Sequence, residues 1–493
     1  METEANGGPA WLAATSEPYS GRVPKRNVIL IVVVCLSCLS AYLAREQAVA
    51  GRRFGEVLSL IRASYYEPVD EERLVEAAMD AAVGQLDEHS AYVRGGERAD
   101  LEATLDQTFG GVGLELAIDE RRRLPIVASP VVDSPAWRAG IRAGDWIDAV
   151  DGRSASDKPL REIVGLLRGR VGEPVSLRIA TAPDTAIATL DPGADGQGPM
   201  AVRDVTLVRE RIDTESVLGD RRGADGRWQW MLEGDPDVGY VRITSFGERT
   251  AGELAAAFAA IEATADVRGL VIDVRGNPGG LLSAAVEACD LLLEDGVIVH
   301  TTTHRSNPEG TAELDARRAT SGAMLAGVPA VVLVDGLTAS AAEIVAACLQ
   351  DSGRAKVVGS RSFGKGTVQS IVPLSDDRGL LKLTTSEYLR PSTARIHRRT
   401  GDGDDASWGV TPDAGYEVSP TSETIGRVVA WRRARDAAGP VPPWMTVSGL
   451  PREVDPILTR GLEALSAVAP RTADFGGQEE TSRDDHDSAG TGD

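Results

Sequence analysis

A serine at the expected start of a helix is the first residue of this sequence that could do chemistry. The apolar run Val331–Val334 predicts a buried strand, and a helix is expected to begin at or near Ser340. The first turn of a helix has free backbone N–H groups and the positive end of the helix dipole, so negative charge developing on Ser340 would be stabilised there. Taken alone, the segment is explained more simply by a serine N-cap that forms a capping box with Glu343.

A lysine between two glycines changes that interpretation. Lys365 lies in the run S-F-G-K-G-T-V-Q at 362–369, where the glycines let the backbone pass close to another element. Arginine cannot lose its proton, whereas the pKa of a desolvated lysine can fall far enough for it to act as a base. Ser340 and Lys365 are therefore interpreted as a Ser–Lys dyad. Only five of the 52 basic residues are lysines: Lys25, Lys158, Lys356, Lys365 and Lys382.

Other catalytic and metal-binding patterns are weaker. The sequence has no G-x-S-x-G motif, although a serine triad with distant partners stays open. The four cysteines show no zinc-ligand or disulfide spacing, and neither a metal nor another cofactor is expected. The five histidines have no nucleophile beside them in sequence: His89, His300, His304, His397 and His486.

The elements that must position the dyad alternate between strand and helix along residues 239–385. This alternation predicts an α/β layered domain, in which the Gly269–Val274 strand is buried on both faces. The turn Gly276–Gly280, G-N-P-G-G, follows that strand. Other strands are expected at 240–243, 297–302, 330–334, 356–358, 368–372 and 381–385, and helices at 251–263, at 281–293 and from 340.

Residues 106–183 have a different sequence pattern, which predicts glycine turns and short strands. Residues 139–152 read A-G-I-R-A-G-D-W-I-D-A-V-D-G, a helix is expected near 160–167, and the module resembles a PDZ domain. That resemblance implies that a peptide is added as an extra strand and that a glycine loop holds its C-terminal carboxylate. A purely structural glycine turn is the alternative. The expected peptide-binding residues are Gly110, Gly111, Val112 and Gly113 in the loop, together with Leu114 and Leu116, along which the peptide would lie.

Several further stretches, spread over residues 53–415, resemble the C-terminal processing (tail-specific) proteases, a family of serine peptidases. The resemblance implies a layered, crotonase-like protease core with the β-rich PDZ domain inserted before it. The stretches are L-D-E-H-S-A-Y-V at 86–93, V-G-Y-V-R-I-T-S-F at 238–246, L-V-I-D-V-R-G-N-P-G-G-L-L at 270–282, T-A-S-A-A-E-I-V at 338–345, S-F-G-K-G-T-V-Q at 362–369, L-K-L-T-T-S-E-Y at 381–388 and G-V-T-P-D at 409–413.

The resemblance also implies roles for the matching residues. Ser340 would be the nucleophile, Lys365 its general base, and Gln369 the residue that orients the lysine amine. The oxyanion hole would use preorganised backbone N–H groups. These come from Ala341 and from Gly279 or Gly280.

The sequence departs from the family near the nucleophile. Thr338 and Ala342 replace serines, and Asp335 stands where asparagine is usual. These changes affect rate or pH optimum more readily than reaction type. They also motivate an alternative, a catalytically inactive PDZ scaffold or peptide-binding protein. A third reading, in which the core handles a small acyl ligand, is disfavoured by the serine and lysine together.

An uncharged run near the N-terminus is interpreted as a membrane anchor. Residues 27–44 contain eighteen residues without a charge, near the lower limit for a spanning helix. Arg22, Lys25 and Arg26 precede the run, which predicts that the tail 1–26 is cytoplasmic. The catalytic portion would then be periplasmic, on a single-pass protein of the bacterial inner membrane. A signal peptide cleaved after 48–50, A-V-A, is the alternative.

The net charge and the composition bear on possible partners and on the remaining segments of the chain. The 52 basic and 74 acidic residues give a net charge of −22, which argues against nucleic acid as a partner. Part of that charge lies in the acidic tail 471–493, which is expected to be disordered. The other segments are a helical region at 51–105 with a homodimer interface at 53–92, the PDZ domain at 106–183, connecting strands and loops at 184–235, the protease core at 236–415 and an unmatched C-terminal region at 416–470.

The sequence therefore predicts a membrane-anchored serine endopeptidase. Proteins with exposed C-terminal tails would bind to the PDZ domain as an added strand. Ser340 would then cleave the bound chain through an acyl-enzyme.

Overall fold

The computed structural model describes residues 25–95, 107–181, 200–223, 225–303, 313–320, 322–374, 379–403, 405–439 and 449–467. The chain divides into two units, residues 1–85 and 86–493. The acidic tail expected at 471–493 and nearly all of the tail expected at 1–26 lie outside the described residues.

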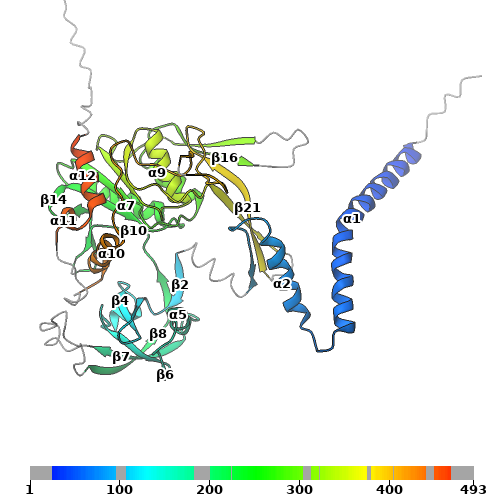
Figure 1. Cartoon of the computed structure of the whole chain (residues 1–493), viewed down its shortest axis with the longest axis horizontal. Helices are drawn as coiled ribbons and strands as arrows, with labels where there is room; N and C mark the ends of the chain where they lie inside the picture. The colour runs from blue at the N-terminus through cyan, green and yellow to red at the C-terminus, as the bar shows by residue number, and fades with distance from the viewer. Residues whose placement is uncertain are drawn as a thin grey trace, which may run out of the picture. The chain divides into compact units, whose positions relative to one another are not determined.

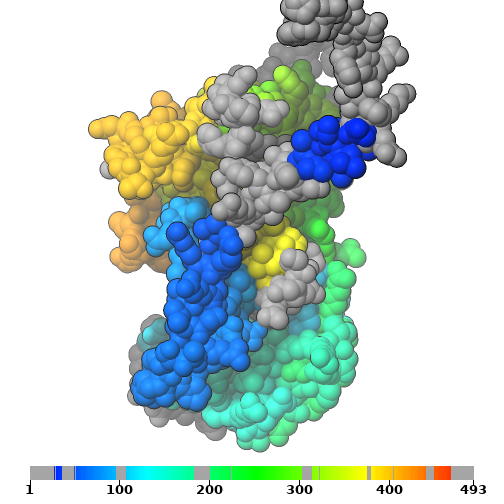
Figure 2. All heavy atoms as spheres, turned by 90° about the vertical axis from the view of Figure 1, so that its right-hand side faces the viewer, coloured from blue at the N-terminus to red at the C-terminus, as the bar shows by residue number. Residues whose placement is uncertain are grey.

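The first unit is helical. Helix α1 spans Lys25–Ser64 and helix α2 spans Glu71–Val83. Asp70 caps α2, because its carboxylate accepts a hydrogen bond from the backbone N–H of Arg73 at 3.2 Å. Figure 2 shows the described side chains of these helices in shades of blue. Exposed apolar side chains of α1 include Phe54, Val57 and Leu60.

The expected membrane anchor at 27–44 is wrong. In the part of the chain that the structure describes, no helix combines the length and the apolar character needed to cross a membrane. The uncharged run belongs to α1, which continues without a break through Arg45, Glu46, Arg52 and Arg53. The predicted single-pass location at the bacterial inner membrane is contradicted by the same finding. The periplasmic placement of the catalytic portion loses its basis as well.

A six-stranded sheet forms the centre of the second unit (Figure 1). Its order is β10–β14–β15–β18–β19, with β13 also paired to β14, and the strands from β14 to β19 are parallel. Every residue of β15 and β18 is buried, as their apolar runs predict. The strands are β10 (Val217–Leu218), β13 (Met231–Leu232), β14 (Asp235–Ile243), β15 (Gly269–Asp273), β18 (Ala330–Val334) and β19 (Ala355–Gly359).

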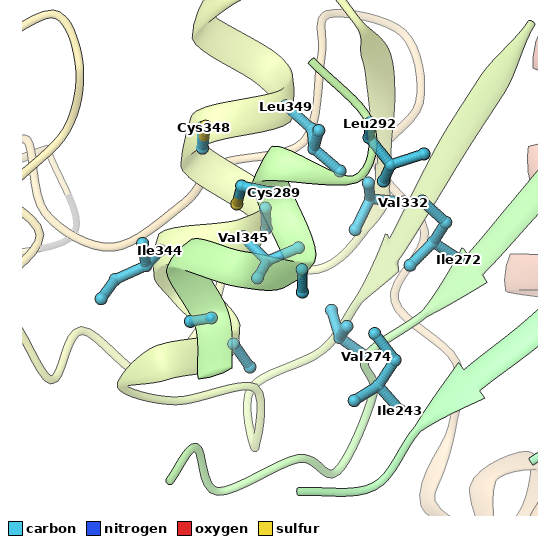
Figure 3. Close-up of a cluster of buried hydrophobic side chains, with 14 of the residues drawn as sticks. Ile243, Ile272, Val274, Cys289, Leu292, Val332, Ile344, Val345, Cys348 and Leu349 are labelled. Atoms are coloured by element: carbon cyan, nitrogen blue, oxygen red, sulfur yellow. The ribbon is translucent and has the colours of Figure 1, made fainter. Parts of the chain in front are cut away.

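Three helices pack in the largest buried cluster of this sheet: α7 (Thr250–Glu262), α8 (Leu282–Asp290) and α9 (Ala341–Asp351). Figure 3 shows how side chains such as Val345 of α9 lie toward Ile272 of β15. Each fully buried aliphatic side chain contributes roughly 1.5–3 kcal/mol by leaving water. This packing fixes helix α9, and with it the residue immediately before the helix.

Helix α12, Pro456–Ala467, packs in a second buried cluster on the same sheet. Leu458 of α12 is fully buried in this cluster together with Val331 of β18. A glycine permits the close approach, because a Cβ on Gly461 would lie 2.9 Å from Cδ2 of Leu333. The C-terminal region without a recognised match therefore supplies part of the core. Its other helices are α10 (Ser422–Asp436) and α11 (Pro451–Val454).

A second sheet contains the strand that follows the lysine loop. Strand β20 (Thr367–Pro373) pairs antiparallel with β21 (Gly379–Leu389). Strands β1 and β16 also pair with β21, and β17 pairs with β16. The residues just before the PDZ domain thus join the sheet beside the expected site. These strands are β1 (Ala91–Arg94), β16 (Val297–Thr303) and β17 (Glu313–Arg318).

The PDZ-like region is a β-rich domain with its own core. Its sheet has the order β3–β4–β5–β7–β8, which leaves β3 at an edge, and β6 pairs with β5. Ile147 and Ile163 are fully buried in its hydrophobic cluster. Its elements and the neighbouring short strands are β2 (Thr108–Gly111), β3 (Leu114–Asp119), β4 (Leu124–Pro130), α4 (Pro135–Arg138), β5 (Trp146–Val150), β6 (Arg153–Ser154), α5 (Leu160–Leu167), β7 (Pro174–Thr181), β8 (Ala201–Val208), β9 (Glu210–Asp213), β11 (Arg221–Arg222) and β12 (Trp228–Gln229).

Candidate active site

Ser340 lies in a strained turn between strand β18 and helix α9. Its backbone has φ 58° and ψ −123°, a region that a non-glycine residue adopts at a cost of about 1–3 kcal/mol. A sharp strand–turn–helix of this kind exposes a nucleophile even though the sequence lacks a G-x-S-x-G motif. Ser340 is half-buried.

Two of the residues that depart from the family hold this turn together. The buried hydroxyl of Thr338 donates to the carbonyl oxygen of Val274 at 3.0 Å and accepts from the N–H of Asp335 at 3.0 Å. The carboxylate of Asp335 accepts from the N–H of Gly276 at 2.9 Å. Thr338 and Asp335 therefore connect the turn of Ser340 to the turn at 276–280.

Glu343 joins the serine turn to the lysine loop. Its side chain is fully buried and accepts the backbone N–H groups of Ser340 at 2.8 Å, Gly364 at 2.7 Å and Lys365 at 2.8 Å. The hydroxyl of Ser362 donates to it at 2.6 Å. Burial raises the pKa of Glu343, and the hydrogen bonds to Ser362 and the backbone oppose that shift. The sequence identified only the capping bond to Ser340.

The glycines beside Lys365 allow a close backbone approach, as expected. A Cβ on Gly364 would lie 2.8 Å from the ring of Trp408, and one on Gly366 would lie 2.4 Å from the nitrogen of His397. Lys365 is half-buried, and burial lowers its pKa, with a further lowering from the charge of Lys382. Both effects favour the neutral amine that a general base requires.

Tyr388 of β21, the last residue of the stretch L-K-L-T-T-S-E-Y, is a second link between the two segments, a role that the sequence did not assign to it. Its buried hydroxyl donates to the backbone carbonyl of Lys365, and its N–H donates to the carbonyl of Gly366 at 2.9 Å. Burial raises the pKa of Tyr388, and the Ser340 side chain opposes that shift. Among the hydrogen bonds of the described residues, none joins Ser340 Oγ to Lys365 Nζ.

Gln369 lies on β20 opposite Thr384 of β21. Its Nε2 donates to the hydroxyls of Thr367 at 2.9 Å and Thr384 at 3.4 Å, whereas no bond to Lys365 occurs among the described residues. The Thr384 hydroxyl in turn donates to Asp87 at 3.2 Å. The segment L-D-E-H-S-A-Y-V therefore supports β21, the strand that pairs with the one carrying Gln369.

The glycine turn lies directly against the nucleophile. Gly279 has φ 101°, and a Cβ on it would lie 2.6 Å from Cβ of Ser340 and 2.9 Å from the nitrogen of Ala341. The N–H of Gly279 donates to the side chain of Asn277 at 2.8 Å. Within the described part of the chain, the N–H groups of Gly280 and Ala341 have no hydrogen-bond acceptor.

The expected peptide-binding residues of the PDZ domain lie around the start of strand β3. Gly113 has φ 76°, and a Cβ on Gly110 would lie 2.4 Å from the carbonyl oxygen of Gly169, so both positions require glycine. Val112 is buried, whereas Leu114 and Leu116 are half-buried on β3. Gly110 and Gly111 are part of strand β2 and pair with β9 rather than forming an open loop.

No cluster of three or more His, Cys, Asp or Glu side chains that could hold a metal ion occurs in the residues that the structure describes. Cys289 and Cys348 are buried between α8 and α9, where their mutual contact and burial raise the pKa of Cys289. Figure 3 shows both side chains inside the helix layer, away from solvent.

Comparison with known proteins identifies the family of the two domains. Residues 237–415 match the model of peptidase family S41, and residues 126–181 match a PDZ domain. A carboxy-terminal-processing protease of Bartonella bacilliformis is 35% identical over 73% of this chain and 74% of its own length. The carboxy-terminal processing protease CtpA of Bacillus subtilis is 28% identical over 76% and 74%.

Among solved structures, a photosystem II D1 C-terminal processing protease is 28% identical, with a TM-score of 0.40 over 72% of this chain and 84% of the other. The sequence relatives alone settle the family. This chain belongs to the carboxy-terminal processing proteases, serine peptidases of family S41 that carry a PDZ domain.

Proposed function

We propose that this protein cleaves polypeptides with exposed C-terminal tails, using Ser340 as nucleophile and Lys365 as general base. The single observation that carries this proposal is the buried Glu343, which binds backbone N–H groups of both residues. One carboxylate therefore brings the serine turn and the lysine loop to the same place.

In the first step the Ser340 hydroxyl donates to the neutral amine of Lys365. Its oxygen attacks the scissile carbonyl carbon, and the proton passes to Nζ of Lys365. The peptide C–N bond then breaks, and the leaving amine takes that proton. The neutral amine of Lys365 then deprotonates a water molecule, which hydrolyses the acyl-enzyme and restores the serine.

The oxyanion is stabilised by the N–H groups of Gly280 and Ala341. Ala341 follows Ser340 and Gly280 follows Gly279, which lies against Ser340. Neither N–H has an acceptor among the described residues, whereas the Gly279 N–H is bonded to Asn277. Loss of one such donor typically costs about 3–4 kcal/mol of transition-state stabilisation. Gln369 contributes by orienting the lysine amine through its carbonyl oxygen, because its nitrogen is already bonded to hydroxyl groups.

Two exposed apolar side chains support a polypeptide substrate with apolar residues near the cleaved bond. Leu337 is 67% exposed on the serine turn, and Phe363 is 49% exposed on the lysine loop. The loops are joined by a bond from the Phe363 N–H to the Thr338 carbonyl at 2.9 Å. An apolar segment of substrate would cover both side chains.

The PDZ domain would capture the tail before cleavage. Strand β3 lies at the edge of its sheet, where an extended peptide can add as a further strand. Gly113 provides the backbone turn for carboxylate recognition at the start of that strand. A homodimer through residues 53–92 stays a prediction, for which the exposed Phe54, Val57 and Leu60 are the supporting observation.

The test is cleavage of a disordered peptide with an apolar tail by the full chain and by two variants, Ser340→Ala and Lys365→Ala. Each variant should lose at least about a thousandfold in kcat, because dyad members act as a unit. Lys356→Ala is the matched control. Lys356 of β19 forms an ion pair with Asp413, and the Lys356→Ala variant should retain full activity. Equal turnover by the wild type and both dyad variants would overturn the assignment, and an inactive wild type would favour a peptide-binding scaffold.

A further inference from the structure

A buried carboxylate from beyond the matched peptidase region reaches the base of the glycine turn. Asp455 lies between α11 and α12, outside the match that ends at residue 415. Its side chain is fully buried and accepts from Arg275 twice, at 2.9 Å from Nη1 and 2.7 Å from Nη2. The pair is therefore bidentate, the geometry that fixes a guanidinium most firmly.

Arg275 is held from the other side by Asp273 at the end of strand β15. Its Nε and Nη2 donate to the Asp273 carboxylate at 2.9 and 2.6 Å, and its backbone N–H donates to it at 3.1 Å. The hydroxyl of Tyr240 completes the shell of Asp273 at 2.7 Å. Only 12% of the Arg275 side chain is exposed, so the cluster is nearly dry. Arg275 lowers the pKa of Asp273 against the effect of burial, in keeping with an ionised pair.

The position of Arg275 gives this cluster its importance. It is the residue immediately before the turn 276–280, in which Gly279 lies against Ser340 and Gly280 follows it. That turn accepts from the nucleophile loop through the bond from the Ala339 N–H to the Asn277 carbonyl at 2.9 Å. A shift of Arg275 would therefore move the backbone that carries the Gly280 N–H.

We propose that Asp455 is a positioning residue for the oxyanion hole, acting through Arg275 on the glycine turn. The C-terminal segment would then be part of the catalytic apparatus rather than an appendage to the matched domain. The inference rests on the proposed role of Gly280. Asp273 alone binds one side of the guanidinium, whereas Asp455 fixes the other side and so defines the orientation of Arg275.

The experiment compares Asp455→Asn with the wild-type full chain. Asparagine has the same shape and still accepts the N–H of Leu458, which donates to Oδ1 of Asp455 at 3.1 Å. The measurements are kcat, KM, the inhibition constant of a peptide boronate that mimics the tetrahedral intermediate, and the affinity of the cleaved product peptide. Asp455→Asn should lower kcat by about tenfold and weaken the boronate by a similar factor, while KM and product affinity change less than about twofold.

A matched control comes from the same C-terminal segment. Arg452 of α11 forms a bidentate pair with Asp235 of β14, at 2.7 and 2.6 Å, without touching the glycine turn. Arg452→Gln should lower the melting temperature but leave kcat and boronate affinity unchanged. If Asp455→Asn does not fold, Asp455→Glu is used instead, because it keeps the charge and displaces the carboxylate by one methylene. Its kcat should lie between that of the wild type and the tenfold reduction expected for Asp455→Asn.

The proposal is overturned if Asp455→Asn, or Asp455→Glu in its place, keeps the wild-type kcat. It is also overturned if boronate and product affinities fall by equal factors, which would indicate a general loss of structure. A failure of the dyad assignment is distinguishable, because Ser340→Ala would then remain active whatever the result at position 455.

Discussion

The serine turn and the lysine loop reach the same place by different means. The serine turn is held by its own residues, Thr338 and Asp335, and continues into α9, where residues 341–349 are all buried. The lysine loop at 360–366 has no regular structure, and Glu343, Tyr388 and Trp408 hold it from outside. The nucleophile therefore lies at the start of a buried helix, whereas the base is positioned by contacts with side chains from other parts of the chain. Changes at those contacts should affect catalysis more than they affect the fold.

The largest effect is expected at the contact that both regions share. Glu343→Gln replaces one carboxylate oxygen with an N–H₂ group facing backbone donors. The N–H groups of Ser340 and Lys365 share Oε2, and the Gly364 N–H binds Oε1, so the lysine loop loses a bond whichever oxygen is replaced. We expect kcat to fall at least about a hundredfold, with roughly 1–3 kcal/mol lost from the free energy of unfolding. Steady-state kinetics and urea denaturation measure the two quantities.

Glu423→Gln is the control for that substitution, because Glu423 is exposed in the first turn of α10. It should leave both quantities unchanged. A Glu343→Gln enzyme with normal kcat would show that the two regions are positioned independently.

A smaller effect is expected at a contact that mainly serves the lysine loop. Tyr388→Phe removes the hydroxyl bond to the Lys365 carbonyl while keeping the ring in the core. We expect kcat to fall about tenfold, with about 1 kcal/mol lost from the free energy of unfolding. Because burial raises the pKa of Tyr388, the loss should be the same at every pH in the working range. A faster Tyr388→Phe enzyme would instead identify the tyrosine as a brake on the Ser340 hydroxyl.

The smallest effect is an electrostatic one on the base alone. The positive charge of Lys382 lowers the pKa of Lys365, second to burial. Lys382→Gln removes that charge and stabilises protonated Lys365, so the pKa of Lys365 should rise. The acid limb of kcat/KM should move to higher pH by a few tenths of a unit, and less at high salt, because salt screens the interaction. A shift to lower pH, or none at low salt, would contradict this.

The difference between the regions also explains what the sequence could predict. Ser340, Lys365 and the glycine turn lie in short contiguous patterns. The alternation of strands and helices predicted the layered core, and the glycine-containing run at 139–152 predicted the PDZ domain by its resemblance. Tyr388 ends one of the family-like stretches, but its role, like that of Asp455, escaped notice because its partners are far away in the chain and no spacing connects them. Glu343 was identified only as a cap, since its bonds to the lysine loop depend on tertiary packing. The anchor prediction rested on the uncharged run alone, whereas no helix of the described residues combines the length and the apolar character needed to cross a membrane.

Helix α12 has a consequence for how the protein is made. It is the last element described, yet Leu458, Leu462 and Leu465 bury an apolar face of the central sheet. Domains begin to fold from the N-terminal side during synthesis. Until residues 456–467 leave the ribosome, that face has nothing to cover it, and the Asp455 partner of Arg275 is missing. Completion of the fold therefore waits for α12, and a chain cut short before α12 would present an apolar surface to chaperones and quality-control proteases.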